Sequence, residues 1–71
     1  MKLVEIGSYL SRRRKALKIS QQELAELCGV SVHALCNLER GVGNPTFDVL
    51  SSVSEALGLA FGMSPRVLEG A

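Results

Sequence analysis

The three residues Gly29-Val30-Ser31 constrain the fold of this chain more than any other feature. Before them, Ser20-Gln21-Gln22-Glu23 forms a capping box, in which a hydroxyl and a carboxylate bind the first amides of a helix, so we expect a helix to begin at Gln21. The glycine then ends that helix, and the serine caps a second helix over Val32 to Arg40, which Gly41 ends. Two short helices joined by so tight a turn are expected to lie nearly perpendicular to each other.

The segments on either side predict two more helices. Apolar residues at helical spacing indicate an amphipathic helix from about Val4 to Ala16. After the loop Gly41 to Pro45, Thr46 caps a further helix that Gly58 closes. The residues expected to face the core are Ile6, Leu10 and Leu17 in the first helix, Leu24, Ala25, Leu27 and Cys28 in the second, Leu35 and Leu38 in the third, and Val49, Leu50, Val53 and Leu57 in the fourth.

Length and composition fit such a helical arrangement. The chain has 71 residues, which is room for one domain, and it is 46% hydrophobic but only 4% aromatic, so an aliphatic core is expected. We expect an all-α fold, a compact bundle of four or five helices in a single domain spanning residues 1–71, with its core in 6–59 and a helix-turn-helix motif in 20–40. A domain of this size is often stabilised by a partner subunit.

The hydrophobic period changes after the fourth helix. From Leu59 the apolar residues alternate, which predicts a short strand in a C-terminal strand or tail, 59–71. A lone strand leaves backbone groups unpaired, so we expect it to pair with the same strand of a second copy, with Leu59, Phe61 and Met63 at the interface of a homodimer. The alternative is a fifth helical turn or an ordered tail that packs Leu59 and Phe61 onto the core.

The charge pattern is uneven, although the net charge is only +1. Five basic residues fall within seven positions, so one end of the molecule is expected to carry a positive field. They are Arg12, Arg13, Arg14, Lys15 and Lys18. Because Arg13 and Arg14 lie on or beside the apolar stripe of the first helix, at least one guanidinium is expected to be pressed inward and to need a carboxylate partner.

Several functional classes are disfavoured by what the sequence lacks. One histidine, no glycine-rich phosphate loop and no paired carboxylates argue against an enzyme, and no cofactor is expected. Cys28 and Cys36 are the only cysteines and there is neither a secretory leader nor a long apolar span, so we expect a cytoplasmic protein without a membrane partner. His33 and Cys36 could offer at most two ligands, so no metal site is expected.

The outer face of the third helix carries small polar side chains that suit a DNA major groove. Asn37 can pair with adenine, His33 can bond a base edge and Val32 can contact a thymine methyl group. The starts of two helices offer backbone amides to phosphates nearby. The predicted DNA-contacting residues are Gln21, Gln22, Ser31, Val32, His33, Cys36, Asn37, Arg40 and Asn44. The alternative is an ordinary solvated helix face.

The chain closely resembles the phage repressor and Cro-like helix-turn-helix family, the regulators of the xenobiotic-response-element type, from about Ile6 to Leu59. The resemblance is carried by Gln21-Gln22-Glu23-Leu24-Ala25, Gly29-Val30-Ser31, Leu38-Glu39-Arg40-Gly41, Asn44-Pro45 and Glu55-Ala56-Leu57-Gly58. It implies a lambda repressor-like bundle whose third helix enters the major groove. The implied function is that of a sequence-specific transcriptional regulator, a repressor, binding a double-stranded operator as a dimer.

The resemblance also implies roles for individual residues. Gln21 would bind phosphate, and Arg40 and Asn44 would flank the DNA backbone. Val32, His33 and Asn37 would read bases. An arginine at the position of Arg14 pairs with an acid at the position of Glu39, which supplies the carboxylate that the first helix needs.

Some positions depart from the family pattern or point to a subgroup. Lys18 stands where relatives usually have glycine, so strain is expected there, and Arg13 replaces a more usual leucine. The stretch 56–63 resembles the antitoxin subgroup, so one alternative is an antitoxin of a type II pair that regulates its own operon and binds a toxin protein. A further alternative is a protein-interaction module that does not bind DNA.

Overall fold

A computed structural model of the chain describes residues 2–60, which form four helices and no strand. These are α1 (Leu3–Ala16), α2 (Gln21–Cys28), α3 (Val32–Arg40) and α4 (Phe47–Ala56). The predicted all-α fold is therefore confirmed, with α1 beginning one residue earlier than expected. None of these four helices is long and apolar enough to span a bilayer.

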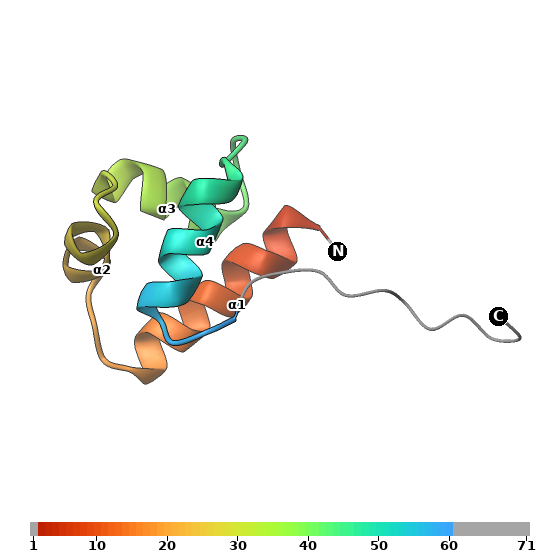
Figure 1. Ribbon diagram of the computed structural model, residues 1–71. Helices are drawn as coiled ribbons and strands as arrows, with labels where there is room; N and C mark the ends of the chain where they lie inside the picture. The colour runs from red at the N-terminus through yellow and green to blue at the C-terminus, as the bar shows by residue number, and fades with distance from the viewer. Residues whose placement is uncertain (1, 61–71) are drawn as a thin grey trace, which may run out of the picture.

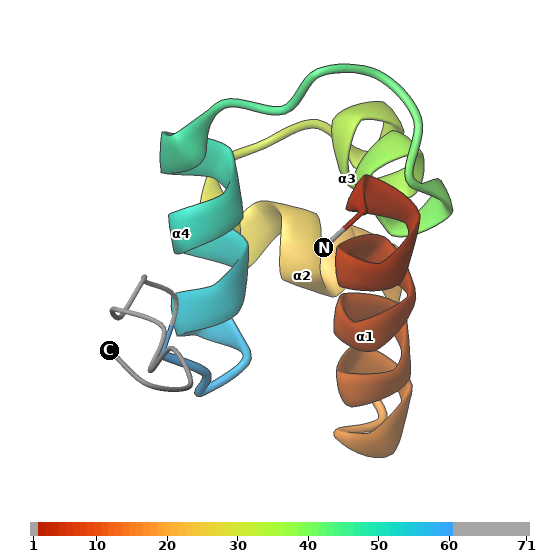
Figure 2. The ribbon, with the colours of Figure 1, turned by 90° about the vertical axis from the view of Figure 1, so that its right-hand side faces the viewer.

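The helices pack as a small bundle in which α3 contacts α1 and α2, and α2 also contacts α4 (Figures 1 and 2). Figure 2 shows α2 between α1 and α4, with α3 across one end of the bundle. The loop from α3 to α4 arches over that same end. Within the helix-turn-helix unit, α3 thus lies at the end of the bundle away from the C-terminal end of α4, whereas α2 lies between α1 and α4 (Figure 2).

Hydroxyl groups begin three of the four helices. The oxygens of Ser20, Ser31 and Thr46 each accept a hydrogen bond from the backbone amide three residues later, at 3.0, 3.0 and 3.2 Å. The carboxylate of Glu23 also accepts from the Ser20 amide at 3.0 Å, which completes the predicted capping box. These bonds are local in sequence, and for that reason the starts of α2, α3 and α4 fall where they are predicted.

Glycines end α2 and α3 in the left-handed conformation, with φ of +71° at Gly29 and +73° at Gly41. The residue after each glycine folds back onto its helix. The amide of Val30 donates to the Ala25 carbonyl and that of Val42 donates to the Asn37 carbonyl, at 3.1 and 3.0 Å. The turn between the two helices is therefore fixed by backbone geometry that glycine adopts without steric cost.

The core is aliphatic, and most of the predicted inward residues lie in it. The buried apolar residues are Leu10, Leu24, Ala25, Leu35, Leu38, Val53 and Leu57. Two predictions of inward side chains are wrong, since Leu17 is 44% exposed and Leu27 is 68% exposed. Leu17 follows the end of α1, where the chain turns away from the bundle.

The exposure of Leu27 follows from the angle at which α2 faces the core. Successive residues of an α-helix are rotated by about 100°. The core-facing arc of α2 therefore runs from Leu24 through Cys28 to Ala25, and Leu27 lies beyond Leu24, about 100° from the middle of this arc. The spacing of the apolar residues alone does not show that Ala25, at one edge of the apolar stripe, is buried and that Leu27, at the other edge, is exposed.

A glycine allows α1 and α3 to approach each other closely. A Cβ atom on Gly7 would collide with the carbonyl oxygen of Leu38 and would lie 2.9 Å from that of Glu39. No local sequence pattern marks Gly7, because its importance comes from a helix distant in sequence. This close packing brings the last turn of α3 within reach of the side chains of α1.

The two departures from the family pattern have visible consequences. Lys18 has a φ of 59°, so the predicted strain of a nonglycine residue is confirmed at this position. The Nε of Arg13 donates to the Leu57 carbonyl at 3.0 Å. A cation therefore lies at the C-terminal end of α4, where unpaired carbonyls favour positive charge.

The end of the described chain matches one part of the tail alternative. Leu59 is partly buried against the core, and its amide donates to the Ser54 carbonyl at 2.8 Å. Residues 59 and 60 are not in a strand. Phe61 and Met63, the other residues of the predicted dimer strand, lie outside the described residues, so this pairing stays a prediction.

Candidate nucleic-acid interface

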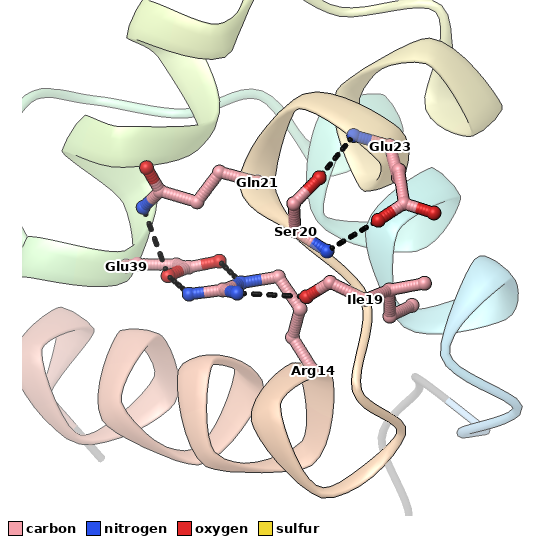
Figure 3. A network of polar contacts seen from close by, with 6 residues as sticks. All are labelled: Arg14, Ile19, Ser20, Gln21, Glu23 and Glu39. Carbon is pink, nitrogen blue, oxygen red and sulfur yellow. Dashed lines mark hydrogen bonds and ion pairs between the residues drawn. The ribbon is translucent and has the colours of Figure 1, made fainter.

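A buried ion pair joins α1 to α3. The Nε of Arg14 lies 2.7 Å from Oε2 of Glu39, and Nη2 donates to Oε1 at 3.0 Å (Figure 3). The Nη1 of Arg14 donates to the Ile19 carbonyl at 2.9 Å. The side chains of Arg14 and Glu39 are only 10% and 5% exposed, and a two-pronged bond of this kind offsets much of their desolvation.

Gln21 extends this network to α2. Its Nε2 donates to Oε1 of Glu39 at 3.1 Å, so this one carboxylate contacts α1 and α2 from its place on α3 (Figure 3). The sequence predicted a phosphate-binding role for Gln21. In the structure Gln21 is half-buried, and one of its two side-chain N–H groups is committed to Glu39.

The carboxylate of Glu39 is held in its charged form. Burial alone would raise the pKa of Glu39, but hydrogen bonds from Arg14 and Gln21, together with the positive charge of Arg14, outweigh burial and lower it. The hydrogen bond to Glu39 in turn raises the pKa of Arg14. The pair is therefore fully ionised at neutral pH, with its opposite charges neutralising each other inside the bundle.

The predicted DNA-contacting residues lie along the start of α2, on α3 and in the loop after it. Those that are exposed are Gln22, Ser31, Val32, His33, Arg40 and Asn44, whereas Gln21, Cys36 and Asn37 are half-buried. Val32 has 43% of its surface exposed at the first position of α3, as its predicted contact with a thymine methyl group requires. The hydroxyl of Ser31 is occupied in capping α3.

The structure brings two of the predicted base-reading residues together. Nδ2 of Asn37 lies 3.3 Å from Nε2 of His33, one helical turn earlier on α3. Asn37 also lines a hollow of about 200 Å³ between α3 and the loop that follows it, and Asn44 lines the hollow from the loop. Asn37, predicted to touch a base, and Asn44, predicted to flank the DNA backbone, therefore border the same hollow.

The part of the predicted DNA-contacting surface that α3 and the following loop form has no unpaired carboxylate, whereas the exposed Glu23 lies at the start of α2. Between Glu26 and Asp48 the only acidic residue is Glu39, which is buried against Arg14. Over the same stretch Arg40 is exposed. A polyanion could therefore approach α3 and the following loop without meeting an uncompensated negative charge.

The starts of α2 and α3 offer backbone donors to the same surface. Each capping serine takes the third amide of its helix, which leaves the two preceding amides without a partner inside the helix. These amides belong to Gln21 and Gln22 in α2 and to Val32 and His33 in α3. Exposed amides at a helix start are suited to phosphate oxygens.

Two contacts near the site were not predicted. The Ile19 carbonyl that receives Arg14 belongs to a segment without regular structure, and no sequence signal marks it. The bond from Gln21 to Glu39 joins residues 18 positions apart, which only the packing of α2 on α3 brings together. The i, i+4 spacing of His33 and Asn37, in contrast, was available in the sequence as a signal that they could contact each other.

Comparison with known proteins agrees with this geometry. The helix-turn-helix family profile matches residues 10–64. The chain belongs to the helix-turn-helix family. This membership confirms the resemblance predicted from the motifs of α2, the turn and α3.

Two relatives of this helix-turn-helix chain are named as HTH-type transcriptional regulators. An uncharacterized HTH-type transcriptional regulator of Mycobacterium tuberculosis strain H37Rv is 42% identical over 51 residues, which are 72% of this chain and 36% of the relative. An uncharacterized HTH-type transcriptional regulator of Sinorhizobium fredii is 36% identical over 55 residues, which are 78% of this chain and 71% of the relative. The chain thus spans about a third of the length of the mycobacterial relative.

Proposed function

We propose that this protein is a sequence-specific DNA-binding transcriptional regulator that inserts α3 into the major groove of an operator. Val32, His33 and Asn37 read base edges, while Gln22, Arg40 and the amides at the helix starts bind phosphates. The protein acts by binding and not by catalysis. The relatives named as HTH-type transcriptional regulators support this function.

One observation carries the proposal above the others. The only acidic residue of α3 and the following loop is Glu39, and its charge is compensated by the buried ion pair with Arg14. That pair also fixes α3 against α1, and Gln21 fixes it against α2. A polar helix without free negative charge, whose first two amides have no partner inside the helix, is suited to the major groove.

We further propose that the protein acts as a repressor and binds as a homodimer. Among residues 2–60, seven apolar residues are buried in the core, and a domain with so small a core is often stabilised by a partner subunit. A two-fold dimer reads two half-sites that are separated by one turn of DNA, about 34 to 36 Å.

Binding to labelled duplex DNA across a salt series tests the proposal. Each phosphate contact adds to the slope of log affinity against log salt concentration. We expect Arg40→Gln to weaken binding to all sequences alike and to reduce the slope by about one for each protomer bound. Arg40 is exposed and lies outside the core, so this substitution is not expected to unfold the protein.

Arg12→Gln is the matched control. Arg12 is also exposed but lies on α1, outside the proposed interface, and its loss changes the net charge by the same amount. The slope of Arg12→Gln should stay close to that of the unmodified protein. Equal effects of the two substitutions would mean that only net charge matters, and binding without any salt dependence would refute DNA binding.

A further inference from the structure

The contact between His33 and Asn37 couples the tautomer of the ring to the orientation of the amide. The nitrogen of an asparagine amide can only donate, so the 3.3 Å contact between Nδ2 of Asn37 and Nε2 of His33 is a hydrogen bond in the ring tautomer whose Nε2 carries no proton. In that tautomer the ring proton is on Nδ1. Both residues are on α3 at positions i and i+4, where side chains of one helix face meet.

This contact leaves a defined set of hydrogen-bonding groups on Asn37. One N–H is used by His33, and the second N–H and the carbonyl oxygen Oδ1 have no partner among the described residues. One donor beside one acceptor matches adenine, which presents the N7 acceptor and the N6 amino donor in the major groove. Guanine presents two acceptors there and would need two donors.

The surroundings of Asn37 hold it in place from two other directions. Its backbone carbonyl accepts the Val42 amide at 3.0 Å, which fixes the last turn of α3 to the following loop. Its side chain is half-buried at the wall of the hollow that Leu38, Val42 and Asn44 also line. His33, in contrast, is exposed, so its ring can be substituted without disturbing the core.

We propose that His33 is a positioning residue for Asn37, and that the two side chains read a single adenine as one hydrogen-bonded unit. The unprotonated Nε2 of His33 holds the amide of Asn37 in the orientation that presents a donor and an acceptor to the base. This inference rests on the proposed function and deepens it, because it assigns one base to one pair of residues in place of two independent contacts.

The test is a double-mutant cycle on a duplex selected by the unmodified protein. The quantity measured is the ratio of affinities for adenine and for each other base at the position where Asn37→Ala loses its preference. A bidentate contact to a base corresponds to a preference of about 5- to 150-fold. His33→Phe, which keeps a ring but removes the acceptor, should lose nearly as much of this preference as Asn37→Ala, and the double variant should lose no more.

Ser8→Ala is the control, because Ser8 is exposed on α1, outside the proposed interface. It should leave the adenine preference unchanged. If His33→Phe and Asn37→Ala relax preference at two different base pairs, with effects that multiply in the double variant, the residues read independently and the proposal is wrong.

A second measurement separates this inference from the proposed function because it needs no DNA. Nitrogen chemical shifts of the His33 ring should show the tautomer protonated at Nδ1 in the unmodified protein, and a shift toward the Nε2-protonated tautomer in Asn37→Ala. An Nε2-protonated ring in the unmodified protein, or no change in the variant, would overturn the pairing. If the ring behaves as expected but the protein shows no sequence preference, the pair exists and the proposed function fails, together with the reading role.

Discussion

The carboxylate of Glu39 joins α3 to two other helices. Its carboxylate accepts hydrogen bonds from Arg14 on α1 and from Gln21 on α2. Replacement by glutamine removes the negative charge and leaves the buried guanidinium uncompensated. We expect Glu39→Gln to lower the free energy of unfolding by about 3 to 5 kcal/mol, measured by urea denaturation. Glu55→Gln, at an exposed position of α4, should change it by less than about 0.5 kcal/mol, and a similar loss in both variants would contradict this role.

The same carboxylate predicts how stability depends on pH. The pKa of Glu39 is lower in the folded protein than in the unfolded chain, so the unfolded state takes up a proton more readily as the pH falls. The stabilisation is fully present above the unfolded-state pKa of about 4.3 and is lost as the pH falls through the folded-state value. Urea unfolding between neutral and acidic pH should show a steeper acid loss in the unmodified protein than in Glu39→Gln. If both proteins lost stability equally with falling pH, Glu39 would not be a source of the pH dependence.

Lys18 is strained by its backbone. A nonglycine residue with a φ of 59° has its Cβ close to the backbone, at a cost of about 1 to 2 kcal/mol, and glycine avoids this cost but gains freedom in the unfolded chain. We expect Lys18→Gly to raise the free energy of unfolding by about 0.5 to 1 kcal/mol, measured by denaturant titration. Lys18→Ala removes the same side chain but keeps the strain, and it should leave stability nearly unchanged. A gain of equal size in both variants would point to the lysine charge and not to the backbone.

At the scale of the helices, the contact between α1 and α3 depends on the missing side chain of Gly7. Alanine is the better helix former by about 1 kcal/mol, but its Cβ would collide with the carbonyl of Leu38, which cannot move without the helix. The collision should win, and we expect Gly7→Ala to lower the free energy of unfolding by about 1 to 2 kcal/mol in thermal or urea denaturation. Ser8→Ala, one residue along on the exposed side, should be neutral or stabilising. A stabilising Gly7→Ala would show that α1 and α3 are not so close.

The helices differ in how far the sequence predicts them. The bounds of α2 and α3 follow from hydroxyl caps and glycine ends, because these signals act within a few residues. The exposure of Leu27 and the close approach at Gly7 could not be predicted, since both depend on how one helix lies against another. The burial of Leu35 and Leu38 on α3 was predictable from their helical spacing. The bond from Gln21 to Glu39 was not, because it depends on the packing of α2 on α3.

At the scale of the whole molecule, the charges matter by their placement more than by their sum. The net charge is only +1, yet the one acid among the residues of α3 and the following loop is neutralised by Arg14 inside the bundle. The ion pair therefore has two consequences: it fixes the angle of α3 and it removes negative charge from the face that we propose binds DNA. Stability and the proposed recognition thus depend on the same three-helix contact.

Selection of bound duplexes from a random DNA pool tests this account most directly. The unmodified protein is expected to enrich a two-fold symmetric sequence with half-sites about 34 to 36 Å apart, and Asn37→Ala should enrich the same sequence with one base pair in each half-site relaxed. Enrichment of no sequence by the unmodified protein, or of an identical sequence by both proteins, would contradict the reading of DNA by this face of α3.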